Sequence, residues 1–269
     1  MIKTYRYRLY PNKEQQAILS EILRLACWLY NRALDYRRKR WNESRKSISY
    51  YDQTYIWKNW RNEDTDNNPL RLINANAGCQ ILRRLDNTYK QFIKGNKGFP
   101  RFKKSSRFNS INYMFGNGIQ IKKNRLYIQN VGLIKIRLHR KLPEGKIKQA
   151  IVLRKPSGWY VLFQIDLPEQ PIKISINPPI GIDMGISHAL ALSDGTFFDS
   201  PKYLKASLKR LRVLQRSVSR KKKGGKNRQK AIKEVARLYE HITNQRSDWW
   251  HKTTYQLVNN YGTIALEKL

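Results

Sequence analysis

The sequence predicts an α+β protein of several domains: an antiparallel β-barrel interrupted by a helical insert, followed by an α/β domain. Three observations support this prediction. Apolar residues recur at helical spacing between residues 13 and 94, and they alternate with polar residues between 108 and 168. From residue 180 onward, short apolar strands precede long basic helices and one final strand.

The first strand is predicted at residues 2–10, where Tyr7 and Leu9 alternate with Arg6 and Arg8. Such alternation is typical of a half-buried strand, here with a basic outer face. The helical insert separates this strand from the later strands in the sequence. We nevertheless expect it to complete the barrel that those strands form.

The helical insert begins directly after this strand. Asn12 stands where it can cap the first helix, with a glutamine three residues later as in a capping box. Apolar residues at helical spacing then continue to about Trp41. Residues 50–60 and 70–94 are also predicted to be helical, and the polar segment 62–69 between them is interpreted as a loop.

The character of the sequence changes at residues 94–104, where glycine and proline interrupt a stretch without acidic residues. Residues 108–168 then show short period-two segments with basic outward positions, which predict an antiparallel β-domain or small barrel. Residues 169–178, rich in proline, are interpreted as a linker. The predicted domains are a barrel of residues 1–12 plus 95–170 and a helical domain of residues 13–94.

The predicted third domain covers residues 178–269. Two apolar strands lie between residues 180 and 193, and Asp194–Gly195 turns the chain into a third. A pair of helices is predicted over 202–241 and another helix over 246–260, before the last strand in "TIALEKL" at 263–269. Hairpin strands, helices and a further strand in this order are typical of a ribonuclease-H-like core.

The charge balance indicates a polyanionic partner. Lysine and arginine number 54 against 19 acidic residues, a formal charge of +35. A membrane is the competing polyanion, but the many interspersed aromatic residues favour base stacking, and no apolar run approaches the roughly 20 residues of a membrane span. Cys27 and Cys79 lack metal-binding spacing and are interpreted as reduced core residues, so we expect a cytoplasmic protein without a membrane partner.

Two carboxylates are candidates for chemistry. Asp183 lies within the apolar stretch "IGIDMGI", where an ionised side chain is costly unless a cation meets it, and Glu267 occupies a similar place in the last strand. Side by side on parallel strands, they would hold Mg²⁺ or Mn²⁺. The alternatives are a turn or cap residue for Asp183 and a solvated strand end for Glu267.

Five stretches together resemble the OrfB/TnpB proteins of bacterial insertion sequences. They are "YRLYPNKEQQ", "GFPRFK", "GIDMGISHALALSDG", "SRKKKGGKNRQKA" and "NQRSDWWHKTTYQLVNNYGTIALEKL". The resemblance implies an RNA-guided nuclease related to type V CRISPR effectors, with a wedge-like β-barrel, a helical recognition domain and a RuvC nuclease domain. It also implies that Asp183 and Glu267 are the first catalytic aspartate and the glutamate of the RuvC site, with a guide RNA and double-stranded DNA as partners.

The same resemblance raises an expectation about residues beyond Glu267. In the family, a structural Zn²⁺ segment with paired cysteines and a third catalytic aspartate follow this glutamate, and neither is present in the 269 residues. We therefore expect an incomplete RuvC domain that does not cut DNA alone. A non-cleaving RNA-guided DNA-binding protein and a DNA-binding accessory of transposition without RNA are the alternatives, and the oligomeric state stays open.

Basic residues in three places are the candidate contacts to nucleic acid. Residues 201–230 contain thirteen lysines or arginines and no acid, which favours a phosphate-binding surface over a merely solvated helix face. Tyr30, Asn31 and Arg32 are weaker candidates, because Trp28 and Tyr30 on an amphipathic helix are more often core residues. The residues assigned to nucleic-acid binding are Arg6, Arg8, Arg101, Lys103, Arg216, Arg220, Lys221, Lys222, Lys223, Lys226 and Arg228.

Overall fold

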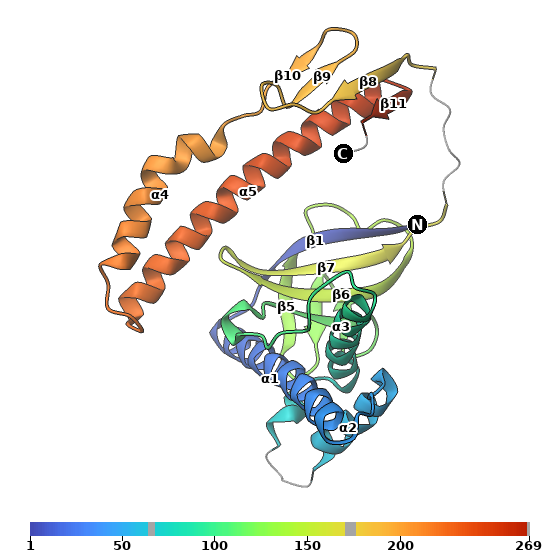
Figure 1. Ribbon diagram of the computed structural model, residues 1–269, viewed down its shortest axis with the longest axis vertical. Coiled ribbons are helices and arrows are strands. Elements are labelled where there is room, and N and C mark those ends of the chain that lie inside the picture. Colours follow the sequence, from blue (N-terminus) through green and yellow to red (C-terminus); the bar gives the residue numbers. More distant parts are fainter. Residues whose placement is uncertain (64–67, 170–175, 268–269) are drawn as a thin grey trace. The chain divides into compact units, whose positions relative to one another are not determined.

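The computed structural model describes residues 1–63, 68–169 and 176–267, and the chain divides into two compact units, Met1–Glu169 and Gln170–Leu269. Half of the predicted polar loop, most of the predicted linker and the last two residues lie outside the described residues. Figure 1 shows the elements of both units. None of the described helices is long and apolar enough to cross a membrane.

The first unit begins as the sequence predicts. Strand β1 (Ile2–Tyr10) buries Tyr7 and Leu9 and turns Arg6 outward. Asn12 caps helix α1 (Lys13–Ser44): its Oδ1 accepts a hydrogen bond from the Gln15 backbone at 2.8 Å, and the Gln15 side chain accepts one from the Asn12 backbone at 3.1 Å. This capping box confirms the predicted helix start.

Two further helices complete the helical part, with one correction. Helix α2 (Tyr50–Asn62) follows the prediction, but α3 runs only from Ala75 to Ile93, after a short 3-10 turn over Pro69–Leu72. The predicted continuous helix over 70–94 was therefore wrong at its start. The physical reason is Asn74, whose side chain accepts from the backbone of Ala77 at 3.0 Å and so begins a new helix.

The barrel prediction is confirmed in its coarse form. Among the described residues of the first unit, seven antiparallel strands form one nearly closed sheet in the order β2-β6-β7-β1-β5-β4-β3. Strand β1 lies between β7 and β5, so the first strand joins the later ones as expected. The later strands are β2 (Ser110–Met114), β3 (Ile119–Lys122), β4 (Arg125–Ile128), β5 (Gly132–Arg137), β6 (Lys146–Lys155) and β7 (Gly158–Asp166).

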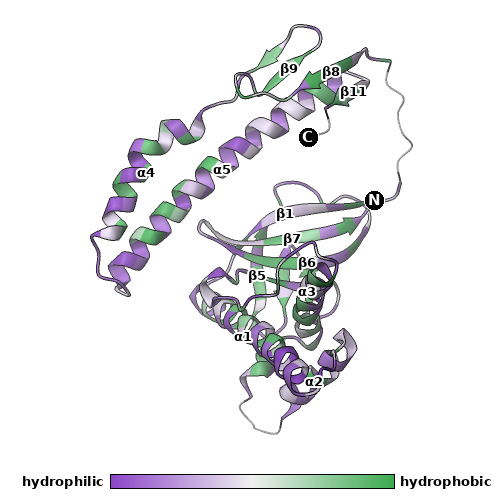
Figure 2. Ribbon diagram, in the orientation of Figure 1, coloured by the Kyte–Doolittle hydropathy of each residue, from purple (hydrophilic) through white to green (hydrophobic). Residues whose placement is uncertain are grey.

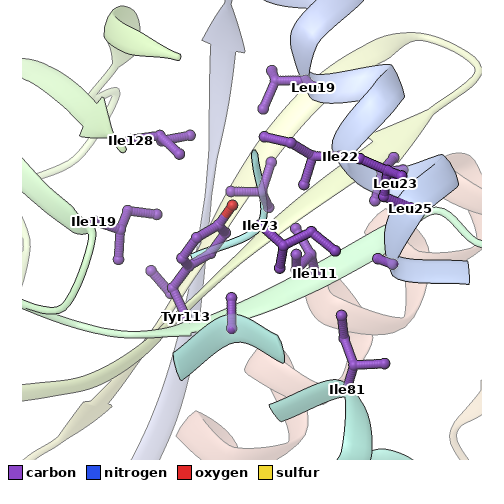
Figure 3. Close-up of a cluster of buried hydrophobic side chains, with 14 of the residues drawn as sticks. Leu19, Ile22, Leu23, Leu25, Ile73, Ile81, Ile111, Tyr113, Ile119 and Ile128 are labelled. Atoms are coloured by element: carbon purple, nitrogen blue, oxygen red, sulfur yellow. The ribbon is translucent and has the colours of Figure 1, made fainter. Parts of the chain in front are cut away.

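One hydrophobic core joins the helices to this sheet. Figure 3 shows side chains of this core from both parts, among them Leu19 and Ile22 of α1, Ile81 of α3 and the strand residues Ile111 and Tyr113. Burial raises the pKa of the Tyr113 hydroxyl above its ordinary value. The shared core means that the helical part and the barrel do not form separate hydrophobic interiors.

A buried polar network ties the three helices together. Arg37 of α1 donates to Gln53 of α2 at 2.7 Å and contacts Asp86 of α3 at 3.0 Å. Gln53 in turn donates to the backbone oxygen of Ala33 at 2.9 Å, and Lys90 pairs with Asp86 at 3.0 Å. The charged pair is compensated on both sides, as a buried ion pair requires.

The second unit holds a smaller sheet and two long helices. Its described strands β8 (Pro179–Asp183), β9 (Leu190–Leu192), β10 (Phe197–Phe198) and β11 (Thr263–Leu266) form a four-stranded sheet in the order β10-β9-β8-β11. Strands β8 to β10 are antiparallel neighbours, whereas β11 runs parallel to β8. A strand hairpin, helices and a returning parallel strand follow one another in the predicted order.

The helices of this unit differ from the prediction in one respect. Helix α4 covers Tyr203–Ser219, and α5 continues without a break from Lys226 to Asn260. The predicted division of α5 near residue 241 was wrong, because neither glycine nor proline interrupts the sequence between these ends. Leu257 near the end of α5 packs on the sheet residues Ile180 and Ile182.

Candidate metal-binding hollow and nucleic-acid interface

The parallel pairing of β8 and β11 brings the two predicted carboxylates together. Ala265 pairs with Gly181 and Leu266 with Ile182, so Glu267, the residue directly after β11, lies at the same end of the two strands as Asp183. Neighbouring strands lie roughly 4.8 Å apart, which is within reach of two side chains that share one cation. Asp183 and Glu267 thus reach the same end of the sheet from positions 84 residues apart in the sequence.

The two acids line one hollow on the sheet face that points away from Leu257. Residues of a strand alternate between faces, so Gly181 and Asp183 lie opposite the buried Ile180 and Ile182. Small side chains make the floor of the hollow, which leaves it a volume of ≈ 500 Å³. The lining residues are Gly181, Ile182, Asp183, Ala191, Leu192, Ser193, Ala265, Leu266 and Glu267.

Asp183 lies at the end of a strand and not, as the sequence predicted, in its middle. It is the last residue of β8 and is exposed, as is Glu267, whereas the sequence placed it in the middle of a buried strand. Asp183 pairs with Ala191 in the last pair between β8 and β9, and β8 ends there. Its carboxylate therefore needs no cation to be stable, and the convergence with Glu267 is the stronger argument.

The surroundings fix the hollow through hydrogen bonds that the sequence did not reveal. The Gly181 backbone donates to Ser193 Oγ at 3.1 Å, which holds β8 against the β9 turn. The Tyr261 hydroxyl donates to Asp194 at 2.5 Å, lowering the pKa of Asp194 and raising that of Tyr261. This bond ties the residue Tyr261, shortly before β11, to the turn between β9 and β10. It thereby helps to hold β11 in place beside β8.

The donor set suits a hard divalent cation. Carboxylate oxygens are the ligands that Mg²⁺ and Mn²⁺ prefer, and Mg²⁺ is commonly held by one or two carboxylates together with water and substrate phosphates. Within residues 1–63, 68–169 and 176–267, no group of three or more His, Cys, Asp and Glu gathers as a metal site. Cys27 is buried and Cys79 half-buried, both as free thiols.

The basic run of the sequence forms the turn between α4 and α5, which we call the basic turn. Purple, the most hydrophilic colour, is dense at this end of the two helices in Figure 2. Arg216 lies in the last turn of α4, and Lys226 and Arg228 lie in the first turn of α5. The turn between them holds Arg220, Lys221, Lys222 and Lys223, of which Lys221 donates to Ser217 at 2.7 Å.

The start of α5 concentrates positive charge further. Gly225 stands at the cap position without a side-chain cap, and the first turn contains no acidic residue. Lys226 and Arg228 at a helix N-terminus oppose the macrodipole, which favours anions there. An anion such as a phosphate would accept hydrogen bonds from the exposed backbone N–H groups and would reduce the repulsion between the cations.

The remaining predicted nucleic-acid contacts lie in the first unit, and their side chains differ in how far they are engaged by other residues of the protein. Arg6 is exposed, with its guanidinium carbon 5.6 Å from the centre of the Tyr160 ring. Arg8 is half-buried and donates to the Tyr160 hydroxyl at 3.0 Å and to the Ser157 backbone at 2.6 Å. A large part of the Arg8 side chain therefore has an intramolecular role.

Arg101 and Lys103 are exposed on a loop that α1 fixes in place. Asn31 accepts a hydrogen bond from the Lys103 backbone N–H at 2.8 Å and donates to its carbonyl at 2.9 Å. Both functional atoms of Asn31 are thus used to hold the loop, and Tyr30 is buried in the core. Of the weaker candidates, Arg32 alone presents its side chain to solvent.

Two family models match parts of this chain. A family model described as "Probable transposase", OrfB of the IS605 type, matches residues 163–269. A second, described as "Helix-turn-helix domain" of the same OrfB type, matches residues 1–46. In the structure these 46 residues form β1 and the single helix α1, so they do not contain the two helices of a helix-turn-helix.

Curated relatives match the chain almost from end to end. The Escherichia coli K12 protein named "Putative RNA-guided DNA endonuclease InsQ" is 27% identical over all of this chain and 66% of its own length. A Streptomyces pristinaespiralis protein named "Putative RNA-guided DNA endonuclease" is 29% identical over 99% of this chain and 67% of its own length. The chain thus spans about two thirds of the length of these relatives, and 53% of a Mycobacterium tuberculosis relative that is 24% identical.

Proposed function

Because this chain belongs to the OrfB/TnpB family of insertion-sequence transposases, we propose that it binds a guide RNA and, through it, double-stranded DNA. We further propose that Asp183 and Glu267 belong to a RuvC-like, metal-dependent DNA endonuclease site. The observation that carries the proposal is the parallel pairing of β8 and β11, which brings the two carboxylates to one hollow. The names of the relatives support the RNA-guided mode.

In this proposal, Asp183 and Glu267 each supply carboxylate oxygens to Mg²⁺ or Mn²⁺. Such a cation, when bound, stabilises negative charge on a phosphodiester and activates water for attack. The chain itself contributes the register of β8 and β11 and a floor of glycine, alanine and serine residues. These small residues leave the hollow wide enough for a nucleic-acid backbone to approach the carboxylates.

The basic turn supports binding to phosphates. Its cations would displace the counterions of a nucleic acid, so affinity would fall as the salt concentration rises. In RNA-guided recognition, base pairing reads the sequence and the protein holds the backbones. A surface of lysines and arginines without a fixed geometry of base-reading side chains suits that division of roles.

The first test is co-purification of the full chain with RNA at high salt, followed by sequencing of the bound RNA. We expect one discrete RNA species, and the amount bound should be unchanged in Asp183→Ala. Binding of DNA without any retained RNA would contradict the guided mode and favour the transposition accessory.

The second test is cleavage of a matched plasmid by the RNA-loaded chain in Mg²⁺. Cleavage that depends on the guide and is lost in Asp183→Ala and in Glu267→Ala supports the endonuclease site. Binding of the matched plasmid without cleavage would agree with the incomplete RuvC site expected from the sequence, and also with the non-cleaving RNA-guided binder. Cleavage retained in both variants would remove these two acids from the reaction.

A further inference from the structure

Helix α1 carries a surface that the proposed metal site does not use. Trp28, Arg32 and Tyr36 follow one another at intervals of four residues and therefore lie along one ridge of the helix. Trp60 of α2 contacts all three: its ring centre lies 6.5 Å from that of Trp28, 6.1 Å from that of Tyr36 and 5.7 Å from the guanidinium carbon of Arg32. We call these four residues the aromatic–arginine ridge.

The ridge is open to solvent and unbalanced in charge. Trp28 is 43% exposed and Arg32 is exposed, while Tyr36 and Trp60 are half-buried. Among the described residues, Arg32 has no carboxylate partner, and its guanidinium lies over the face of Trp60. Trp28 packs edge-on against Trp60 of the neighbouring helix, yet much of its indole stays in contact with solvent.

We propose that the aromatic–arginine ridge binds unpaired bases of a single-stranded nucleic acid. Indole and phenol rings stack on bases of any sequence, and a guanidinium both stacks on a base and binds phosphate. From Trp28 to Tyr36 the helix rises about 12 Å at 1.5 Å per residue. This length matches three to four bases at the roughly 3.4 Å spacing of nucleic-acid strands.

Charge decides between this ligand and an apolar protein partner. The chain carries a formal charge of +35, and the ridge itself contains an arginine without a carboxylate partner among the described residues. A polyanion that also offers flat rings is therefore the complementary ligand. The inference rests on the proposed function only in its premise that the chain binds nucleic acid. It does not depend on Asp183 or Glu267.

The test compares two labelled single strands of equal length and charge, one with bases and one with abasic sites throughout. Their binding to the full chain is followed by fluorescence anisotropy. We expect the wild type to prefer the strand with bases by about tenfold or more. Trp28→Ala should remove most of this preference and leave the affinity for the abasic strand unchanged, whereas Trp28→Phe should keep most of it.

The matched control is Trp41→Ala on the same helix. Trp41 is 49% exposed and lies nine residues after Arg32, half a turn around the helix axis, so its loss should change neither affinity. An equal effect of Trp41→Ala, or equal losses for both strands in Trp28→Ala, would overturn the proposal. So would a wild type that binds both strands equally.

The nucleic-acid source is settled by running the strand with bases as RNA and as DNA. If Trp28→Ala weakens the binding of the RNA or of the DNA strand, the proposal is supported, and the strand whose affinity falls is the one that the ridge binds. A wild type that binds no strand and no guide RNA would overturn the proposed function together with this inference. A wild type that retains guide RNA but shows no preference for bases overturns the inference alone.

Discussion

Asp86→Ala is predicted to destabilise the first unit strongly, because it leaves a buried guanidinium without its anion. Arg37 is 8% exposed and Asp86 11%, and their closest atoms lie 3.0 Å apart. After the substitution, Arg37 keeps its bond to Gln53 and its position 4.8 Å from the ring centre of Tyr89. Breaking a buried pair by removing one partner costs about 3–5 kcal/mol.

The assay is thermal unfolding followed by tryptophan fluorescence, because five of the seven tryptophans lie in Met1–Glu169. For a unit of this size, the cost corresponds to a fall in Tm of roughly 6–20 °C. Asp35→Ala is the matched control, since it breaks an exposed pair with Lys39 (3.1 Å) on α1. Its expected cost is below about 0.5 kcal/mol, and an Asp86→Ala loss no larger than that would refute the reasoning.

The same pair makes the stability depend on pH. Burial raises the pKa of Asp86, but the hydrogen bonds from Lys90 and Arg37 lower it more, so it lies below the ordinary value of 3.8 in the folded state. The unfolded chain then takes up the proton first as the pH falls, and the stabilisation is lost as the pH drops through the lowered pKa. The difference between wild type and Asp86→Ala should therefore be constant near neutral pH and shrink below about pH 4.

Three other predictions concern single positions. Gly78→Ala should lower the free energy of unfolding by about 1–3 kcal/mol, because a Cβ there would overlap the buried Trp57 indole. In the control Gly98→Ala the new Cβ meets no atom within 4 Å, so the urea midpoint should stay unchanged. Asn12→Ala should cost about 1 kcal/mol by removing the cap of α1, and an unchanged urea midpoint would mean that the capping box is dispensable. Lys223→Ala should reduce the slope of log affinity against log salt for duplex DNA by about 0.9 if it contacts one phosphate; an unaltered slope would exclude Lys223 from the contact.

Much of the fold followed from local patterns in the sequence. The alternation around Tyr7 and Leu9 predicted β1, and Asn12 marked the start of α1. The errors came where a pattern allowed two interpretations. Asn74 looked like an interior helix residue but acts as a cap, and the polar middle of α5 looked like a break although it contains no helix-breaking residue.

The candidate site was predictable in part. The separation of strands by long helices predicted a parallel pairing of β8 and β11, which the structure contains. The exposure of Asp183 was not predictable, because the apolar residues after it suggested a longer strand. Nor could local periodicity reveal the pairing of Arg37 with Asp86, or the exposure of Trp28, since each depends on which helix packs alongside.

Titration of the full chain with Mn²⁺, followed by the electron paramagnetic resonance signal of the free ion, tests the central claim most directly. The account predicts one site per chain whose affinity falls by at least about tenfold in Asp183→Ala and likewise in Glu267→Ala. Glu234→Ala, an exposed acid on α5, should leave it unchanged. Mn²⁺ binding that neither Asp183→Ala nor Glu267→Ala weakens would contradict the account.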